Sequence, residues 1–438
     1  MAKIAQPIIE FADIIKSNGL ECREDLSPSN KIVKRFIRIA KHVPDKRMQA
    51  MIDYPLKEIL LIAFFAVLSG VETWEDMADF GRIREPWLKK FLKFKNGIPS
   101  HDTFRRVFSL IPPYILQTLT VDFLIDNMNR IKASIGIEDK GARLINVDGK
   151  AANGTGRKRS KDGEFPNLQT LNVYDASNCI CIRMQDIDKK SNEIPAAQAA
   201  LRMLDIKGAV VTFDALNTQK ATIDVIASKE KGGDYVGALK KNHHIFFEEV
   251  DLYFSEEKLK EIRKNSEHFV TSIDKAHSKI ERRNFYLATD VKWFVDRKKW
   301  TELRAFICYE KILTDTATGE ITKERRLFIS SVADVELCAE AIRGHWAVEN
   351  VLHWHLDASF GDDYDMTTDK NAYLNFSLFR RLALTLCKMS QSFMKCSLRS
   401  MRWRIGLDYK SQLGLILGTL DEEYLEQALR AANEKKAK

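Results

Sequence analysis

The chain has 438 residues, of which 45% are hydrophobic and 30% are charged, and its formal net charge is +8. These values are ordinary for a globular protein of two or three domains, and they exclude a fibrous or largely disordered chain. The modest basic charge is compatible with a polyanionic partner, although it does not require one.

Residues 1–135 are predicted to form a helical domain. Pro55 stands near the start of one helix, where its fixed φ and missing N–H are tolerated. Thr73 and Ser100 are expected to cap two further helices, because an acidic residue follows each of them in the first turn. The most apolar run, 59–68, is shorter than the roughly 20 residues that cross a bilayer, so we expect a buried helix and no membrane segment.

From residue 143 the sequence takes on the periodicity of strands. We expect strands at 143–148, 168–175, 179–187, 208–214 and 234–239, helices at 191–204 and 217–229, and a glycine-rich basic loop at 149–163. Strands that alternate with helices in this order predict an α/β domain over 143–242, with helices packed on a mixed sheet.

The rest of the chain is predicted to divide into two parts. Residues 243–335 are strongly charged and contain strand-like runs at 283–289, 302–311 and 325–332, which indicate a β-rich insertion. Residues 336–432 are expected to be helical, and the first of these helices covers 343–357.

The seven cysteines form no CxxC pair and no dense block, which indicates reduced thiols in a cytoplasmic protein. Cys179 and Cys181 alternate along a predicted strand, so we expect both to be core or surface residues rather than metal ligands. The N-terminal sequence lacks the pattern of a signal peptide, which agrees with a cytoplasmic location.

Three acidic residues stand where a two-metal phosphoryl-transfer site needs them. Asp148 and Asp214 each end an apolar strand-like run, and Glu349 lies in the predicted helix 343–357. Two strand-end aspartates and a distant helical glutamate can converge on a pair of divalent cations, which activate a nucleophile and stabilise the leaving oxygen of a phosphodiester. Gly149 next to Asp148 allows a backbone or a phosphate to approach closely.

The same helix offers a second interpretation. His345, Glu349 and His353 follow at intervals of four residues and therefore share one face, as zinc ligands would. The spacing differs from HExxH, and no cysteine completes the set. His345 is therefore expected to face a phosphate or to support a carboxylate, and His353 to be a packed histidine.

Basic residues gather in three segments, at 31–41, at 157–161 and at 371–410. A single cluster is more often a solvated face, but three around the carboxylates favour contact with phosphates. We expect the DNA contacts to come from these clusters and from the start of the Glu349 helix: Arg157, Lys158, Arg159, Lys161, Arg343, His345, Arg380 and Arg381.

Two tryptophans, Trp293 and Trp300, lie in a basic stretch of the insertion. Either they anchor a small β-rich unit, or one of them stacks on an unpaired base near the cleaved bond. Both alternatives remain open at the level of sequence.

Several segments resemble the H-repeat-associated insertion-sequence transposases. They are 54–61, 73–81, 96–108, Val-Asp-Gly-Lys at 147–150, Lys-Ser-Asn-Glu-Ile at 190–194, 207–215, Ala-Leu-Lys-Lys-Asn at 238–242, and 343–357. Together the resemblance covers roughly residues 43–420.

The resemblance implies a ribonuclease H-like fold with a mixed five-stranded sheet, and a DDE triad at Asp148, Asp214 and Glu349. It also implies two Mg²⁺ ions, for which Mn²⁺ can substitute, double-stranded DNA at the element's ends and at the target, a homodimer on DNA, and a place in the bacterial cytoplasm at the nucleoid. The helical domain 1–135 is then expected to bind DNA.

The chain departs from the family pattern at two places. The family has Asp-Ala-Met-Gly after its second aspartate, where this chain has Asp214-Ala215-Leu216-Asn217, and the basic residue expected after Asp362-Asp363 is missing. Two other functions remain as alternatives: a structure-specific metal-dependent nuclease on the same fold, and an inactive DNA-binding protein descended from a transposase.

Overall fold

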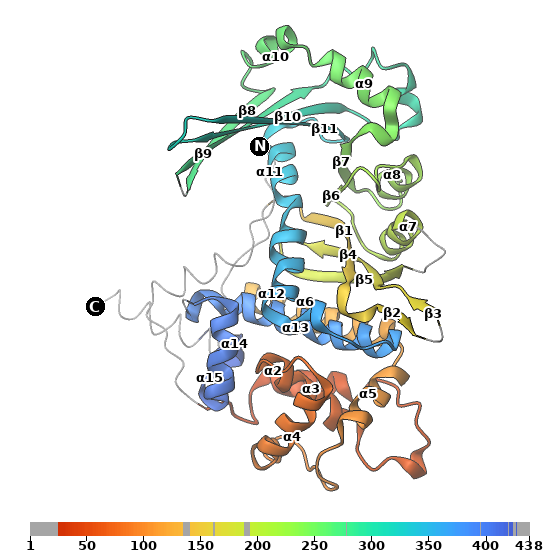
Figure 1. The fold of residues 1–438 in the computed structure, drawn as a ribbon, viewed down its shortest axis with the longest axis vertical. Coiled ribbons are helices and arrows are strands. Elements are labelled where there is room, and N and C mark those ends of the chain that lie inside the picture. The colour runs from red at the N-terminus through yellow and green to blue at the C-terminus, as the bar shows by residue number, and fades with distance from the viewer. Residues whose placement is uncertain are drawn as a thin grey trace, which may run out of the picture.

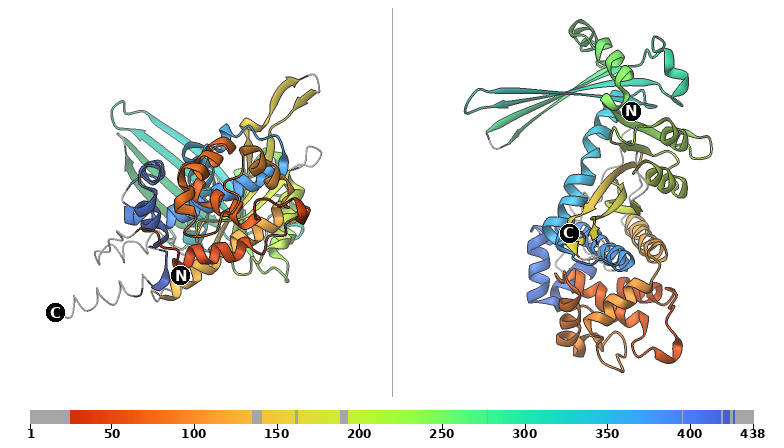
Figure 2. Two further views of the ribbon diagram at one scale, coloured as in Figure 1. Left: turned by 90° about the horizontal axis from the view of Figure 1, so that it is seen from below. Right: turned by 45° about the vertical axis from the view of Figure 1, so that its right-hand side comes forward.

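The computed structural model describes residues 25–134, 141–160, 163–187, 193–276, 278–394, 396–418, 420–423 and 426. Along the long axis of the molecule, a helical N-terminal unit is followed by a sheet with helices on both faces and then by an extension of the same sheet (Figure 1). The views in Figure 2 show the strands of this extension twisting and projecting from one side of the molecule.

The N-terminal unit consists of α2 (Lys31–Ala40), α3 (Leu56–Leu68), α4 (Trp74–Leu88), α5 (His101–Leu110) and α6 (Pro113–Ser134). The predicted helix caps are confirmed, because the hydroxyls of Thr73 and Ser100 accept hydrogen bonds from the backbone N–H groups of Asp76 and Thr103. Apolar residues surround α3 on every side, and the helix is buried at the centre of the unit.

In the described chain, no single helix is long and apolar enough to cross a membrane. The helices α5 and α6 pass that test only as a pair, and they are bent by 93° relative to each other.

The central sheet begins with β1 (Leu144–Ala152), β4 (Leu168–Asp175), β5 (Ile180–Ile187), β6 (Val210–Phe213) and β7 (Asp234–Leu239). Their order is β5-β4-β1-β6-β7; β1 runs antiparallel to β4 and parallel to β6. The helices α7 (Glu193–Met203) and α8 (Lys220–Ala227) cover one face (Figure 1). The predicted mixed sheet with packed helices is therefore confirmed.

The insertion continues this sheet. Its strands β8 (Phe269–Ala276), β9 (Lys279–Ala288), β10 (Ala305–Asp315) and β11 (Ile321–Ser330) extend the order as β7-β11-β10-β9-β8, so the sheet has nine strands where five were expected. The reason is that β11 pairs with β7. Two helices, α9 (His244–Tyr253) and α10 (Glu256–Ile262), also precede these strands in a region that was expected to be β-rich.

The expected loop at 149–163 is also different. The strand β1 runs on through Ala152, and the basic segment forms a hairpin of β2 (Arg157–Ser160) and β3 (Gly163–Phe165). The strand β4 provides the backbone partner that allows β1 to continue.

The C-terminal part contains α11 (Val335–His345), a π-helical turn (Val348–His353), α12 (Trp354–Phe360), α13 (Lys370–Met394), α14 (Leu398–Leu407) and α15 (Tyr409–Gly418). α13 packs against α3, α5 and α6, so the end of the chain joins the sheet to the N-terminal unit. The rings of Trp74 and Phe376, which are tilted by 39° with centroids 4.5 Å apart, belong to this junction.

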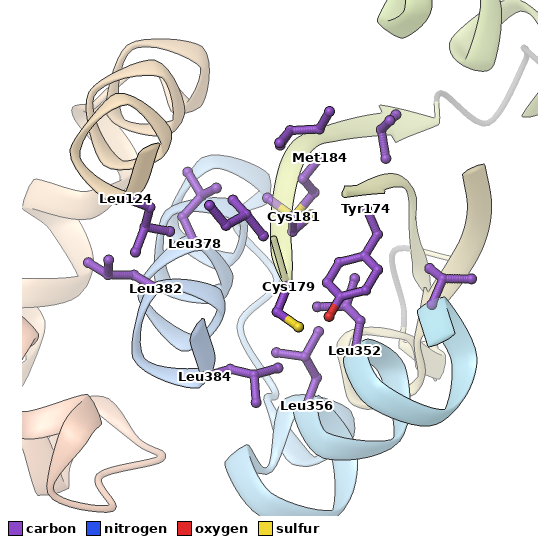
Figure 3. Close-up of a cluster of buried hydrophobic side chains, with 14 of the residues drawn as sticks. Leu124, Tyr174, Cys179, Cys181, Met184, Leu352, Leu356, Leu378, Leu382 and Leu384 are labelled. Carbon is purple, nitrogen blue, oxygen red and sulfur yellow. The ribbon is translucent and has the colours of Figure 1, made fainter. Parts of the chain in front are cut away.

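A buried cluster fixes the helix that carries Glu349 against the sheet. Figure 3 shows Leu352 and Leu356 pointing toward Tyr174 and Cys179, with leucines of α13 beside them. Cys179 and Cys181 are both buried here, which confirms the prediction for the core and excludes an exposed thiol at these two positions.

Candidate functional site

The fold places Asp148 and Asp214 at neighbouring positions on adjacent parallel strands. The last residue pair of β1 and β6 is Val147 with Phe213, and each aspartate is the next residue of its strand. Asp148 does not end β1, as the sequence suggested, because β4 continues to pair with it. Asp148 instead marks the point at which the pairing of β1 with β6 ends.

Glu349 approaches the same region from the opposite helix layer. The helix is held close to β1 at Gly344, whose carbonyl accepts a hydrogen bond from Asn146 Nδ2 at 2.7 Å. A Cβ at position 344 would collide with the end of the Leu144 side chain, so a larger residue would force this buried leucine to move. Glu349 then lies in the π-helical turn, a local widening that is frequent at functional sites.

The carboxylates act on one another electrostatically. Burial, and after it the negative charges of Glu349, Glu193 and Asp214, raises the pKa of Asp148 to about 7. The structure therefore brings Asp148, Asp214 and Glu349 into one electrostatic environment. It also adds a fourth carboxylate, Glu193, which the sequence interpretation missed.

Glu193 and Asp214 are connected by Asn217. Its side-chain Nδ2 donates to Glu193 Oε1 at 2.6 Å and to Asp214 Oδ1 at 3.2 Å, and its backbone N–H donates to the same Asp214 oxygen at 3.0 Å. Asn217 is fully buried, and its Oδ1 has no hydrogen-bond partner within the described residues. The departure from the family pattern at position 217 thus adds a group that holds two carboxylates together.

Gly149 makes room for Glu193. A Cβ at this position would lie 2.6 Å from Glu193 Oε2, closer than real Cβ contacts allow. The only signals in the sequence were the motif Lys-Ser-Asn-Glu-Ile at 190–194 and the glycine after Asp148, and neither indicates that the two segments meet.

His345 supports the site as a neutral side chain. The hydroxyl of Thr212 donates to Asn146 Oδ1 at 2.8 Å, so His345 Nδ1, also 2.8 Å from that hydroxyl, must donate to it. Burial lowers the pKa of His345 to about 4, which leaves its Nε2 without a proton. The structure agrees with a supporting role, because the protonated Nδ1 of His345 is hydrogen-bonded to Thr212.

His353 lies on the other side of Asp148, with its Nδ1 3.6 Å from Asp148 Oδ2. Burial, together with the positive charges of Arg381 and Lys150, lowers the pKa of this imidazole to about 3. It is therefore also neutral at physiological pH.

Over the residues that the structure describes, no three His, Cys, Asp or Glu side chains are grouped tightly enough to hold a metal ion as they lie. This holds for His345, Glu349 and His353 of the zinc interpretation, and equally for Asp148, Asp214 and Glu349. The chemistry of the carboxylates still fits a hard divalent cation, because oxygen ligands are what Mg²⁺ prefers and because their mutual repulsion is what a cation relieves.

A pocket of about 660 Å³ opens beside Asp214, His345 and Glu349. Its wall also contains basic side chains that the sequence interpretation did not single out: Lys240, Lys241, Arg325 and Arg326. Arg325 donates to the carbonyl of Phe254, and Arg326 is paired with Glu324. Lys240 and Lys241 are exposed and form no ion pair with any described residue, so they are free to meet a phosphate.

Two of the expected DNA contacts are wrong. Arg380 is fully buried and paired with Asp362 and Asp365, and Arg381 is buried against Asn172. Their charges are used inside the protein, because α13 is a core helix rather than a solvated one.

The remaining expected contacts divide into two groups. Arg343 is exposed at the end of α11. Arg157, Lys158 and Arg159 lie on β2, but their side chains, like Lys161 as a whole, lie outside the described residues.

The two tryptophans belong to an aromatic core of the insertion. Trp300 is only 4% exposed and packs against Phe246, and the ring of Trp293 stacks on Tyr253 with centroids 4.8 Å apart. The structural alternative therefore explains both residues, and the stacking of Trp300 on a base is excluded by its burial.

Comparisons with known proteins agree with the resemblance to the H-repeat-associated transposases, both in the N-terminal unit and over most of the chain. Residues 37–124 match the family described as "DDE_Tnp_1-associated". Two Escherichia coli K12 proteins, "Putative protein YbfL" and "H repeat-associated putative transposase YhhI", are each 30% identical to this chain, over 392 and 393 residues; each match covers 88% of this chain and 99% of the relative.

Two further similarities are more limited. "Inactive transposase YbfQ" of the same organism is 42% identical over 77 residues, 18% of this chain and 92% of that protein. The cryo-EM structure of a piggyBac transposase synaptic complex with hairpin DNA covers 94% of this chain and 85% of its own, with a TM-score of 0.38 and 10% identity, which is too distant to carry an argument.

Proposed function

Because the chain belongs to the family of the H repeat-associated transposases, we propose that it is a DDE transposase of an insertion sequence. In this proposal it cleaves double-stranded DNA at the ends of the element and joins those ends to target DNA. It acts in the cytoplasm at the nucleoid, as a homodimer assembled on DNA.

One observation supports this proposal above the others. Asp148 and Asp214 follow the last pair of two parallel strands, and Glu349 from a separate helix is close enough to raise the pKa of Asp148. Three carboxylates from distant parts of the sequence would not be brought together in a partly buried site unless a cation or a proton compensated them.

Asp148, Asp214 and Glu349 are the residues that would hold two Mg²⁺ ions, or Mn²⁺ in their place. When bound, such ions supply an activated oxygen nucleophile and neutralise charge at the phosphorus. Asn217 keeps Asp214 Oδ1 occupied, which leaves Oδ2 as the free oxygen of that carboxylate.

The chain's own cations would orient the DNA. Lys240 and Lys241 lie on the wall of the pocket beside Asp214 and Glu349, where they can offset the charge of phosphates on either side of the cleaved bond. We also propose that the sheet is ribonuclease H-like; the five strands between residues 144 and 239, with α7 and α8 on one face, support this assignment.

The proposal is tested with the variants Asp148→Asn, Asp214→Asn and Glu349→Gln on DNA that carries the element's ends. Each variant is expected to lose Mg²⁺-dependent cleavage and to keep its affinity for the ends, because it removes a ligand and leaves the surface unchanged. Glu336→Gln, an exposed acid of α11, is the control and should cleave like the wild type. A triad variant that cleaves at the wild-type rate would remove that residue from the site.

The same assay separates the two alternative functions. A structure-specific nuclease would cut the ends but never join them to target DNA. An inactive DNA-binding descendant would bind the ends, and the wild type would leave them uncut with both Mg²⁺ and Mn²⁺.

A further inference from the structure

We infer that His353 is a positioning residue for Asp148, and that Arg381 acts through Asn172 to keep the imidazole proton on the nitrogen that faces this aspartate. The inference rests on the proposed function insofar as it gives Asp148 a catalytic task. It assigns a role to three buried polar side chains that the proposed chemistry does not otherwise use.

The chain of interactions begins at Arg381 on α13. A guanidinium group only donates hydrogen bonds. Its Nε and Nη2 lie 3.2 and 2.8 Å from Asn172 Oδ1, so this oxygen accepts both bonds. Arg381 is itself fixed by the carbonyl of Ser377, and it is 4% exposed. The amide of Asn172 therefore has one orientation, with its nitrogen directed away from the arginine.

That orientation determines the state of His353. Asn172 Nδ2 lies 3.1 Å from His353 Nε2, and an amide NH₂ group can only donate. His353 Nε2 must accept this hydrogen bond and carries no proton. In a neutral imidazole the single proton is then on Nδ1.

The protonated nitrogen faces the candidate site. His353 Nδ1 lies 3.6 Å from Asp148 Oδ2, slightly longer than a hydrogen bond, and a small rotation of either side chain brings the two atoms within range. The backbone supports the same arrangement, because Asp148 and Asn172 are directly paired across β1 and β4 and so project from the same face of the sheet. His353 enters from the π-helical turn and contacts both.

The consequence is that His353 limits the orientations of the Asp148 carboxylate. A donor at Oδ2 restricts the rotation of the carboxylate. Second-layer donors of this kind typically change metal affinity or activity by about tenfold to hundredfold when they are removed.

The first experiment compares two variants that keep an amide in place of the imidazole. In His353→Asn the amide nitrogen takes the position of Nδ1 and can still donate to Asp148, whereas in His353→Gln the amide takes the position of Nε2 and cannot. We expect the Asn variant to retain most of the Mn²⁺ affinity and end cleavage, and the Gln variant to lose about tenfold in each. Thermal melting monitors folding, and His355→Gln, two residues away, serves as the matched control.

Equal losses in both His353 variants at unchanged melting temperature would overturn the positioning role, as would no loss in either. If the wild type binds Mn²⁺ but cleaves no DNA, the proposed function fails while the affinities still decide this inference.

The second experiment determines directly which ring nitrogen of His353 carries the proton. In the full-length chain labelled with ¹⁵N-histidine, NMR is expected to show the His353 proton on Nδ1 in the wild type, with the resonance assigned by its loss in His353→Gln. Asn172→Asp replaces the donor by an acceptor and should move a proton onto Nε2. A wild-type proton on Nε2 would overturn the inference, whatever the activity.

Discussion

Asp148 combines burial and charge more unfavourably than the other carboxylates of the site. Its pKa is about 7, because burial and the charges of Glu349, Glu193 and Asp214 all disfavour ionisation. In the unfolded chain an aspartate titrates near its usual value of about 3.9. The folded protein therefore binds more protons than the unfolded chain between roughly pH 4 and pH 7, and the stability that this group contributes is lost as the pH rises through that window.

This difference in proton binding predicts that the effect of Asp148→Asn on the melting temperature depends on pH. In buffer without divalent cations, the variant should melt at nearly the same temperature as the wild type at pH 4.5, and at an increasingly higher temperature toward pH 8, because asparagine cannot ionise. Melting curves at four pH values between these limits provide the measurement. A constant difference across the series, such as the exposed control Glu336→Gln should give, would contradict the expected cause.

The place of Glu193 in the candidate site could not be recognised from its own position in the sequence. In the sequence it is an acid in the first turn of a helix, where the helix dipole already explains it. Its place beside Gly149 and its bond to Asn217 depend on how α7 is set against β1 and on the loop after β6. No local sequence pattern encodes these contacts of Glu193 with Gly149 and Asn217.

Among the elements, α13 shows that a segment rich in arginine and lysine can be part of the core rather than a surface for phosphates. The count of lysines and arginines over 371–410 suggested a surface for phosphates, but Arg380, Arg381 and Arg402 are buried in the structure, whereas Arg399 and Arg404 are exposed. α13 is enclosed by the sheet on one side and by the N-terminal helices on the other, so its arginines bind internal partners instead: Arg380 pairs with Asp362 and Asp365, and Arg381 donates to Asn172.

This distinction predicts different outcomes for Arg380→Gln and Arg399→Gln. Removing Arg380 leaves Asp362 and Asp365 buried without their partner, and we expect a loss of about 3–5 kcal/mol in the free energy of unfolding. Arg399→Gln on the exposed surface of α14 should change it by less than about 0.5 kcal/mol. Denaturant titrations of the two variants measure both values, and similar losses would show that burial does not determine the role of these arginines.

Across the molecule as a whole, the exposed lysines Lys240 and Lys241 lie near two of the candidate carboxylates, on the wall of the pocket beside Asp214 and Glu349. If Lys240 and Lys241 each neutralise one DNA phosphate, replacing both by alanine should lower the slope of log K against log salt concentration by about 1.8, since each contact contributes about 0.9. Binding titrations between 50 and 200 mM salt test this. Lys260→Ala, an exposed lysine on α10 away from the pocket, should leave the slope unchanged; an unchanged slope in the double variant would exclude both lysines from the interface.

Local pattern was enough to predict the helix caps at Thr73 and Ser100, the five strands between 143 and 239, and the candidate carboxylates at Asp148, Asp214 and Glu349. These follow from periodicity and from the chemistry of single residues, which neighbouring positions encode. The three-dimensional arrangement was needed to show that β11 pairs with β7, that Arg380 and Arg381 are internal, and that Glu193, Asn217 and His353 lie around the aspartates. Those facts depend on contacts between segments that are distant along the chain, where burial and pairing reassign what a charge or an aromatic ring does.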